Sequence, residues 1–171
     1  MWLIRLLKKN FFLQDAASWF CAKIPPVIEH NLAKYAALRK AFYLTALEQL
    51  EGDYLEFGVF TGSSFVCAIR VHRALKFLGP VKTSFYGFDS FSGFGALALH
   101  DEHPFYRDTV FAVDKERVIR HITKKAKGCF VKIIPGYFED TLKSKDARAL
   151  GIAKARVVLI DCDLKEPARL S

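Results

Sequence analysis

The sequence contains few cysteines, and none of them stands close to another. Its 171 residues include Cys21, Cys67, Cys129 and Cys162, without a Cys-x-x-Cys pair. This spacing argues against a zinc site, and without a secretory signal it indicates reduced thiols. We therefore expect a cytoplasmic protein.

Long apolar runs are also missing. No run approaches the roughly 20 apolar residues that cross a bilayer. The first 20 residues place apolar side chains along one helical side, but Arg5, Lys8 and Lys9 interrupt them too early for a signal sequence. We expect this helix to pack on its own domain or on a second subunit of a homo-oligomer. Contact with a membrane surface is the less favoured alternative.

A dense basic stripe is absent as well. The formal net charge is +8, but the lysines and arginines are scattered along the chain. A nucleic-acid-binding surface would concentrate them, so we expect solvated surface and no nucleic-acid partner.

What is present is enough apolar sequence for one packed domain. Hydrophobic residues make up 51% of the chain and aromatic residues 14%, which argues against disorder. There are no internal repeats. Pro25-Pro26 ends the opening segment, because proline cannot continue a helix. We expect a helical extension over residues 1–30 and one domain over residues 31–171.

Short apolar runs alternate with helical patterns along this domain. Such alternation predicts a mainly parallel sheet, covered on both faces, in a Rossmann-like α/β fold. The runs cover 54–60, 84–91, 130–134 and 155–164; helices are expected over 31–50, from a cap at Ser63 or Ser64 to Gly79, from a cap at Asp114 to Gly128, and over 140–150.

Each predicted strand delivers a carboxylate or a glycine where it ends. Ligands bind beyond the carboxyl ends of the strands in open parallel sheets, so these residues predict a binding site at one edge. They are Glu56, Gly58 and Gly62 after the first strand, Asp89 after the second, Gly136 after the third, and Asp161 and Asp163 after the fourth.

The chemistry of these residues suits a ligand with a ribose and a charged end. Gly58 and Gly62 allow close approach of backbone, and the following helix presents its N-terminal N–H groups. Asp89 suits the two ribose hydroxyls. Dinucleotides and S-adenosylmethionine (SAM) both fit. A turn cap at Asp89 and a solvated strand end at Asp161 remain the simpler alternatives.

The loop sequence separates these two cofactors. A dinucleotide fingerprint requires Gly-x-Gly-x-x-Gly, and Phe60 stands here in place of its middle glycine, where a large side chain would block a pyrophosphate. SAM has no phosphate, and its ammonium group favours a carboxylate such as Glu56. SAM is therefore preferred, and an NAD(P)-dependent oxidoreductase is the alternative.

Four motifs in order resemble the macrocin O-methyltransferase family (TylF/MycF-like) of class I SAM-dependent enzymes. They are YLEFGVFTGSSF from residue 54, YGFDSFSGF from 86, IIPGYFEDTL from 133 and VVLIDCDL from 157. The resemblance runs from about residue 38 to the end of the sequence. It implies methylation of a hydroxyl on a sugar or another small natural product, with help from Mg²⁺.

The resemblance also implies roles for individual residues. Asp161 would be the metal ligand and the base that takes the acceptor's proton, with Asp163 as the neighbouring ligand. The cofactor would be held by Glu56, Gly58, Gly62 and Ser64 at its methionine part, by Asp89 at the ribose, by Ser90 and Phe91 beside the adenosine, and by Gly136, Tyr137 and Phe138 at the adenine.

Two departures from the family pattern affect these expectations. Lys165 follows Leu164 where the family has tyrosine, and the sequence ends at Ser171. We expect only the N-terminal half of the sheet, with the fourth strand at its edge. Activity of the chain as given stays open, and a non-catalytic interaction module or remnant is a further alternative. Residues 92–113 are expected to form a substrate lid.

Overall fold

The computed structural model describes residues 10–79, 81–93, 111–142 and 147–162, in two compact units of residues 1–34 and 35–171. The first unit contains helix α2 (Phe11–Cys21), which Asn10 caps by accepting the N–H of Leu13. Helix α3 (Pro26–Leu47) starts earlier than expected, because proline at the first helical position is preorganised for a helix. In the part of the chain that the structure describes, no helix is long and apolar enough to span a membrane.

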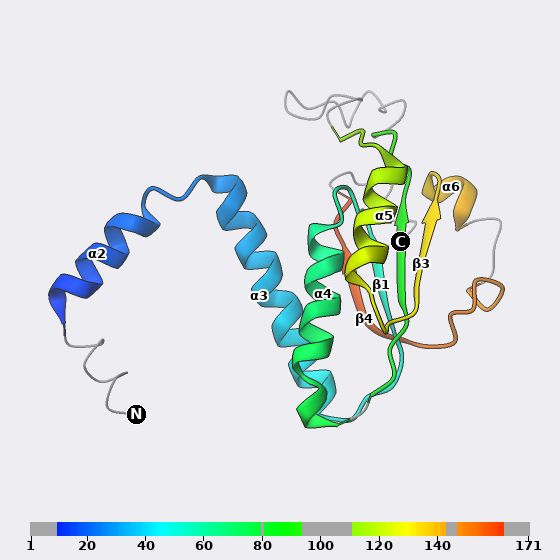
Figure 1. Ribbon diagram of the computed structural model, residues 1–171, viewed down its shortest axis with the longest axis horizontal. Helices are drawn as coiled ribbons and strands as arrows, with labels where there is room; N and C mark the ends of the chain where they lie inside the picture. The colour runs from blue at the N-terminus through cyan, green and yellow to red at the C-terminus, as the bar shows by residue number, and fades with distance from the viewer. Residues whose placement is uncertain (1–9, 80, 94–110, 143–146, 163–171) are drawn as a thin grey trace. The chain divides into compact units, whose positions relative to one another are not determined.

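Four parallel strands form the sheet of the second unit, in the order β3-β2-β1-β4 (Figure 1). This is the predicted Rossmann-like α/β arrangement, with β4 at one edge. The strands are β1 (Asp53–Phe57), β2 (Phe85–Asp89), β3 (Val131–Pro135) and β4 (Ala155–Ile160). The helices are α4 (Ser63–Ala74), the 3₁₀ turn η1 (Lys76–Leu78), α5 (Lys115–Lys125) and α6 (Phe138–Thr141).

The main core lies between one face of the sheet and helices α3, α4 and α5. Tyr54 and Phe85, which are paired across β1 and β2, are both fully buried there. Their rings contact Phe42 of α3 and Phe65 of α4 at centroid distances of 5.6–6.4 Å. Ile122 of α5 completes this layer. Aromatic side chains thus pack α3 and α4 on the sheet, and aliphatic side chains pack α5 there.

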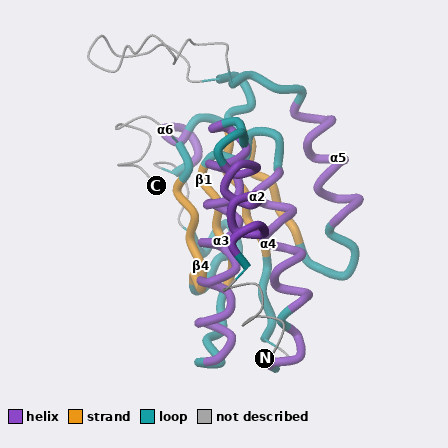
Figure 2. Tube along the Cα trace, turned by 90° about the vertical axis from the view of Figure 1, so that its left-hand side faces the viewer, coloured by secondary structure: helices purple, strands orange, loops and turns teal. Residues whose placement is uncertain are grey.

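The opposite face of the sheet is covered less completely than predicted. Phe57 stacks on Phe88 and meets Phe138 of α6 edge-on. Helices α5 and α6 lie on opposite sides of the strands (Figure 2). On β4, however, Val158 and Ile160 keep 47% and 51% of their surface exposed. The expectation of a sheet covered on both faces is therefore wrong for β4 within the described residues, where no helix packs over these two side chains.

Two local predictions need correction. Helix α4 is preceded by Gly62 in a left-handed conformation (φ 79°), so neither Ser63 nor Ser64 is its cap. The helix expected over residues 140–150 begins earlier, as the short α6, while residues 147–150 form turns and residues 143–146 lie outside the described part. The predicted cap at Asp114 is confirmed by its bond from the N–H of Arg117.

Candidate cofactor-binding site

The carboxyl ends of the four strands meet at one edge, as the sequence predicts. Phe57 is in register with Phe88 on one side and with Ile160 on the other. Asp89 is in register with Pro135. The residues that follow these positions therefore start from neighbouring points on one edge of the sheet.

Glu56 is fully buried and points to the helical face of β1. One carboxylate oxygen accepts a hydrogen bond from the Ser64 hydroxyl at 2.6 Å, and the other accepts one from the Tyr54 hydroxyl at 2.5 Å. Burial, reinforced by the charge of Glu56, raises the pKa of Tyr54 well above its usual value. Glu56 and Ser64 thus join β1 to α4. Their predicted contacts with the methionine part of SAM stay predictions.

The loop between β1 and α4 is closely packed and has an unusual backbone. Gly58, Phe60 and Gly62 all have positive φ angles, of 90°, 48° and 79°. A side chain at Gly58 would place its first carbon 2.1 Å from the carbonyl oxygen of Asp161, so only glycine fits there. The glycines serve the loop's own packing, and their part in binding a ligand stays a prediction.

Asp89 connects this loop to the end of β2. One of its carboxylate oxygens accepts the backbone N–H groups of Val59 and Phe60, each at 2.7 Å. The other accepts the N–H of Phe91, also at 2.7 Å. Carboxylates hold backbone N–H groups strongly because the bonds are charge-assisted. The predicted contact of Asp89 with a ribose remains a prediction beside these three bonds.

The segment after Asp89 is held against the residues that precede α5. Phe91 is buried, has a positive φ of 59°, and accepts the N–H of Val113. The Ser90 hydroxyl donates to the carbonyl of Gly93 at 2.8 Å. Between the same segments, the rings of Phe60 and Phe111 meet edge to face at 5.4 Å. Ser90 and Phe91 therefore lie next to the loop at the end of β1, where the prediction puts the adenosine.

The third strand end contributes Gly136, Tyr137 and Phe138. The N–H of Gly136 donates to the carbonyl of Asp89 at 3.0 Å, so this turn also reaches the shared edge. Phe138 is buried against Phe57 and belongs to the core of the second face. Whether Tyr137 and Phe138 border an adenine stays a prediction.

Asp161 stands at the end of β4, beside the loop after β1. Its N–H donates to the carbonyl of Phe57 at 2.8 Å. Asp163 and the predicted lid over most of 92–113 lie outside the described residues. Among the residues that are described, no three histidine, cysteine or acidic side chains gather in a way that could hold a metal ion. The metal-ligand roles of Asp161 and Asp163 stay predictions.

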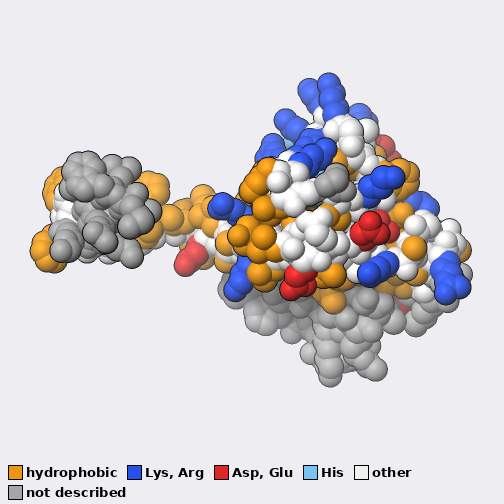
Figure 3. Space-filling model, turned by 90° about the horizontal axis from the view of Figure 1, so that it is seen from below, with side chains coloured by type: hydrophobic (Ala, Val, Ile, Leu, Met, Phe, Trp, Pro, Cys, Tyr) orange, Lys and Arg blue, Asp and Glu red, His pale blue; other side chains and the backbone are white. Residues whose placement is uncertain are grey.

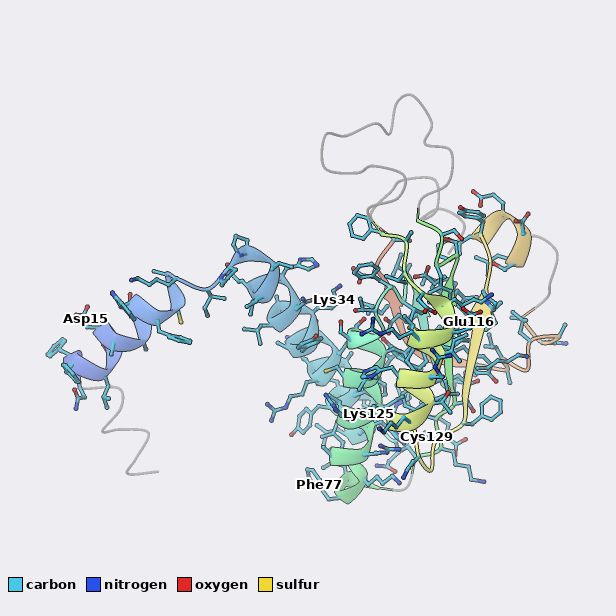
Figure 4. All side chains as sticks on the ribbon, turned by 45° about the horizontal axis from the view of Figure 1, so that its top comes forward. Asp15, Lys34, Phe77, Glu116, Lys125 and Cys129 are labelled. Atoms are coloured by element: carbon cyan, nitrogen blue, oxygen red, sulfur yellow. The ribbon has the colours of Figure 1, made fainter. Side chains whose placement is uncertain are left out.

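Charge is distributed unevenly between the two edges of the sheet. The described loops at the carboxyl edge, residues 57–62, 89–93, 111–114, 136–142 and 161–162, contain five acidic residues and no lysine or arginine. In α5, the first turn carries Glu116 between Lys115 and Arg117, and the last turn carries Lys124 and Lys125 (Figure 4). Viewed from the amino edge, lysine and arginine side chains are more prominent than acidic ones (Figure 3). The described loops at the carboxyl edge therefore carry negative side-chain charge, although the chain as a whole is basic.

Sequence reasoning missed two contributors to this site. Tyr54 lies two residues before Glu56 on the same strand face, and that spacing could have identified it as a partner. The backbone N–H groups of Val59 and Phe60 gave no signal, because a contact with Asp89 across about 30 residues leaves no local pattern.

The fold and the site together define a Rossmann-like α/β domain. Its glycine and acidic residues gather at the carboxyl edge of the sheet, where ligands bind in open parallel sheets. A family model of macrocin O-methyltransferase (TylF) matches residues 30–167. The chain belongs to this family. No curated protein matches the sequence.

Solved structures share the fold. The O-methyltransferase NovP superposes with a TM-score of 0.61 at 24% identity, covering 78% of this chain and 55% of NovP. The calicheamicin methyltransferase CalS11 gives 0.67 at 19% identity, covering 98% of this chain and 67% of CalS11. A ligand-free structure of CalS11, described as a TDP-rhamnose 3'-O-methyltransferase, gives 0.50. The chain thus spans about half to two thirds of the length of these neighbours.

Proposed function

We propose that this chain forms the cofactor-binding part of a SAM-dependent O-methyltransferase acting on a hydroxyl of a sugar or another small natural product. Membership of the macrocin O-methyltransferase family supports the reaction class. The observation that carries the choice of cofactor is the bonding of Asp89 to the loop after β1.

A dinucleotide requires free N–H groups in that loop. In dinucleotide-binding Rossmann folds, the glycine loop and the helix behind it present N–H groups to the pyrophosphate. Here the N–H groups of Val59 and Phe60 donate to the carboxylate of Asp89. A pyrophosphate would have to displace that carboxylate or lie against its negative charge. This argues against an NAD(P)-dependent oxidoreductase.

A cationic cofactor suits the same edge. SAM carries a sulfonium and an ammonium group, and the described loops there hold acidic residues without lysine or arginine. We assign the methionine part to the region of Glu56, Gly58, Gly62 and Ser64, and the ribose to Asp89. Ser90, Phe91 and the turn 136–138 would then border the adenosine.

The bound cofactor supplies an activated methyl group, so the protein mainly has to place the acceptor oxygen in line with it. The acceptor oxygen gains the methyl group and loses its proton. Asp161 is the described carboxylate at the end of β4 and, in this proposal, accepts that proton. The neighbouring Asp163 is the second candidate for this role.

A sugar acceptor is supported by the structural neighbours. CalS11 is described as a TDP-rhamnose methyltransferase in calicheamicin biosynthesis, and it covers nearly all of this chain. The neighbours are longer than this chain, so residues that bind the acceptor need not all lie within it.

Isothermal titration calorimetry with SAM, S-adenosylhomocysteine and NAD tests the cofactor. We expect binding of the first two and none of NAD. As a matched variant, Phe60→Gly removes the side chain that would block a pyrophosphate. We expect no NAD binding by it either, since Asp89 still holds the loop N–H groups. Binding of NAD without binding of SAM would overturn the proposal.

Transfer of labelled methyl from SAM to TDP-sugars tests the reaction. Methylated sugar supports the enzyme. Cofactor binding without methylation of any hydroxyl acceptor would favour the non-catalytic alternative for this chain.

A further inference from the structure

Asp89 bonds to the two strained phenylalanines of the site. Phe60 and Phe91 have φ angles of 48° and 59°, and the N–H groups of both donate to its carboxylate. Besides Gln49, they are the residues other than glycine with positive φ in the described chain. Large side chains rarely adopt this region, because the β-carbon crowds the backbone.

The hydrogen bonds to Asp89 offset the backbone strain at Phe60 and Phe91. Left alone, the Phe60 backbone would relax toward negative φ, and the loop between β1 and α4 would change shape. Bonds to a carboxylate are stronger than bonds between neutral groups, so Asp89 can hold both backbones in the strained region. One side chain therefore sets the conformation of two loops that follow neighbouring strands.

The positive φ angles of Phe60 and Phe91 determine where their rings lie. Phe91 is buried in the core of the helical face, whereas Phe60 keeps 38% of its surface exposed and meets Phe111. A relaxed backbone at Phe60 would move its ring away from Phe111 and withdraw the N–H groups of the loop from Asp89. The loop of residues 58–62 would then lose its present shape.

We infer that Asp89 is a positioning residue, which fixes the loop of residues 58–62 in its cofactor-binding conformation by holding Phe60 in the left-handed region. This rests on the proposed function, and it adds to any direct bond between Asp89 and a ribose. It also explains why a phenylalanine is tolerated where the loop geometry favours glycine.

A double-mutant cycle between Asp89 and Phe60 tests this role. Asp89→Asn keeps the shape but weakens the bonds to backbone N–H, and we expect S-adenosylhomocysteine to bind about tenfold more weakly. Phe60→Gly removes the strain, because glycine adopts positive φ without help. If Asp89 acts through the loop, Asp89→Asn costs much less affinity in the Phe60→Gly background than in the wild type.

Additive effects of the two substitutions would overturn the inference, since a carboxylate that only bonds to a ribose does not act through Phe60. Asp53→Asn is the matched control. Asp53 also accepts a backbone N–H from the neighbouring segment, that of Ser84 at 3.1 Å, but at the opposite edge of the sheet. We expect it to leave affinity unchanged and to show no coupling to Phe60.

The same cycle measured by urea unfolding needs no ligand. We expect Asp89→Asn to lower the unfolding midpoint, and Phe60→Gly to reduce that loss. If the wild-type chain fails to bind S-adenosylhomocysteine, the proposed function fails, while this measurement still decides whether Asp89 holds the loop. Equal midpoint losses in both backgrounds would refute the positioning role.

Discussion

Glu56 and Asp89 stand near the ends of neighbouring strands, yet their surroundings differ. Glu56 is the fourth of five residues in β1 and is fully buried, where its carboxylate accepts two side-chain hydroxyls. Asp89 is the last residue of β2 and is partly exposed, where its carboxylate accepts three backbone N–H groups.

The difference follows from where each residue lies along its strand. A residue inside β1 faces the helix packed on the sheet, whereas the final residue of β2 faces the loops beyond it. Glu56 joins secondary-structure elements, so the larger expected effect of its loss is on stability. Asp89 shapes two loops, so the larger expected effect of its loss is on cofactor affinity. Two acidic residues that the sequence places at one binding site thus differ in which property depends on them most.

Glu56→Ala is the variant with the largest expected effect. It leaves the buried hydroxyls of Tyr54 and Ser64 without their acceptor and opens a cavity, so we expect the free energy of unfolding to fall by about 3 kcal/mol or more. Urea unfolding followed by circular dichroism measures this. Glu56→Gln, which keeps the shape, is the control with an expected loss of about 1 kcal/mol. A loss below about 0.5 kcal/mol for Glu56→Ala would contradict the structural role.

Tyr54→Phe tests the same hydrogen-bond network from the side of the donor. It removes one hydroxyl from Glu56, and we expect a loss of about 1.5 kcal/mol at neutral pH. Because the pKa of Tyr54 is raised in the folded state, the native chain retains this proton longer than the unfolded chain. Wild-type stability should therefore decline as pH rises above about 10.

The Tyr54→Phe variant should lose less stability at alkaline pH, because it lacks the contribution of the Tyr54 hydroxyl. Unfolding measured at pH 8 and pH 10.5 gives the two slopes. The same slope for both proteins would show that folding does not raise the pKa of Tyr54.

His72 provides the smallest expected effect, at the opposite end of β2. Its ring packs on Phe85 and Phe42, and burial, aided by the charges of Arg156, Lys76 and Arg73, lowers its pKa to about 4. The unfolded chain takes up this proton near pH 6.5, so the stabilisation is complete above that pH and is lost as pH falls toward 4.

We expect about 1 kcal/mol of stability to be lost between pH 7 and pH 5, since solvent screens this half-buried group. His72→Gln should flatten that part of the curve. His121→Gln, an exposed histidine of α5, is the control. A curve for His72→Gln that follows the wild type would exclude this assignment.

The four parallel strands and the position of β4 at an edge of the sheet were accessible from the sequence. Apolar runs and glycines marked the four strands, and Asp114 marked the start of α5 through a local capping pattern. These features depend on residues within a few positions of each other. Local rules are sufficient for them.

The hydrogen bonds that connect the strands and loops of the site could not be predicted in this way. The bond between Asp89 and Val59 links residues 30 positions apart, and the burial of Ser64 depends on how α4 packs on β1. Ser64 looked like a helix cap, but Gly62 takes the capping position and frees its hydroxyl for Glu56. Only tertiary packing selects between these two uses of one serine.

The outer edge of β4 has a practical consequence for every experiment on this chain. Within the described residues no strand pairs with it, and Val158 and Ile160 stay half exposed beside it. Bare strand edges with apolar side chains attract the edges of other molecules. In a calorimeter cell, concentrated protein can then release heat by self-association as well as by uptake of ligand. The heat of dilution at several protein concentrations is the baseline against which any titration of this chain has to be judged.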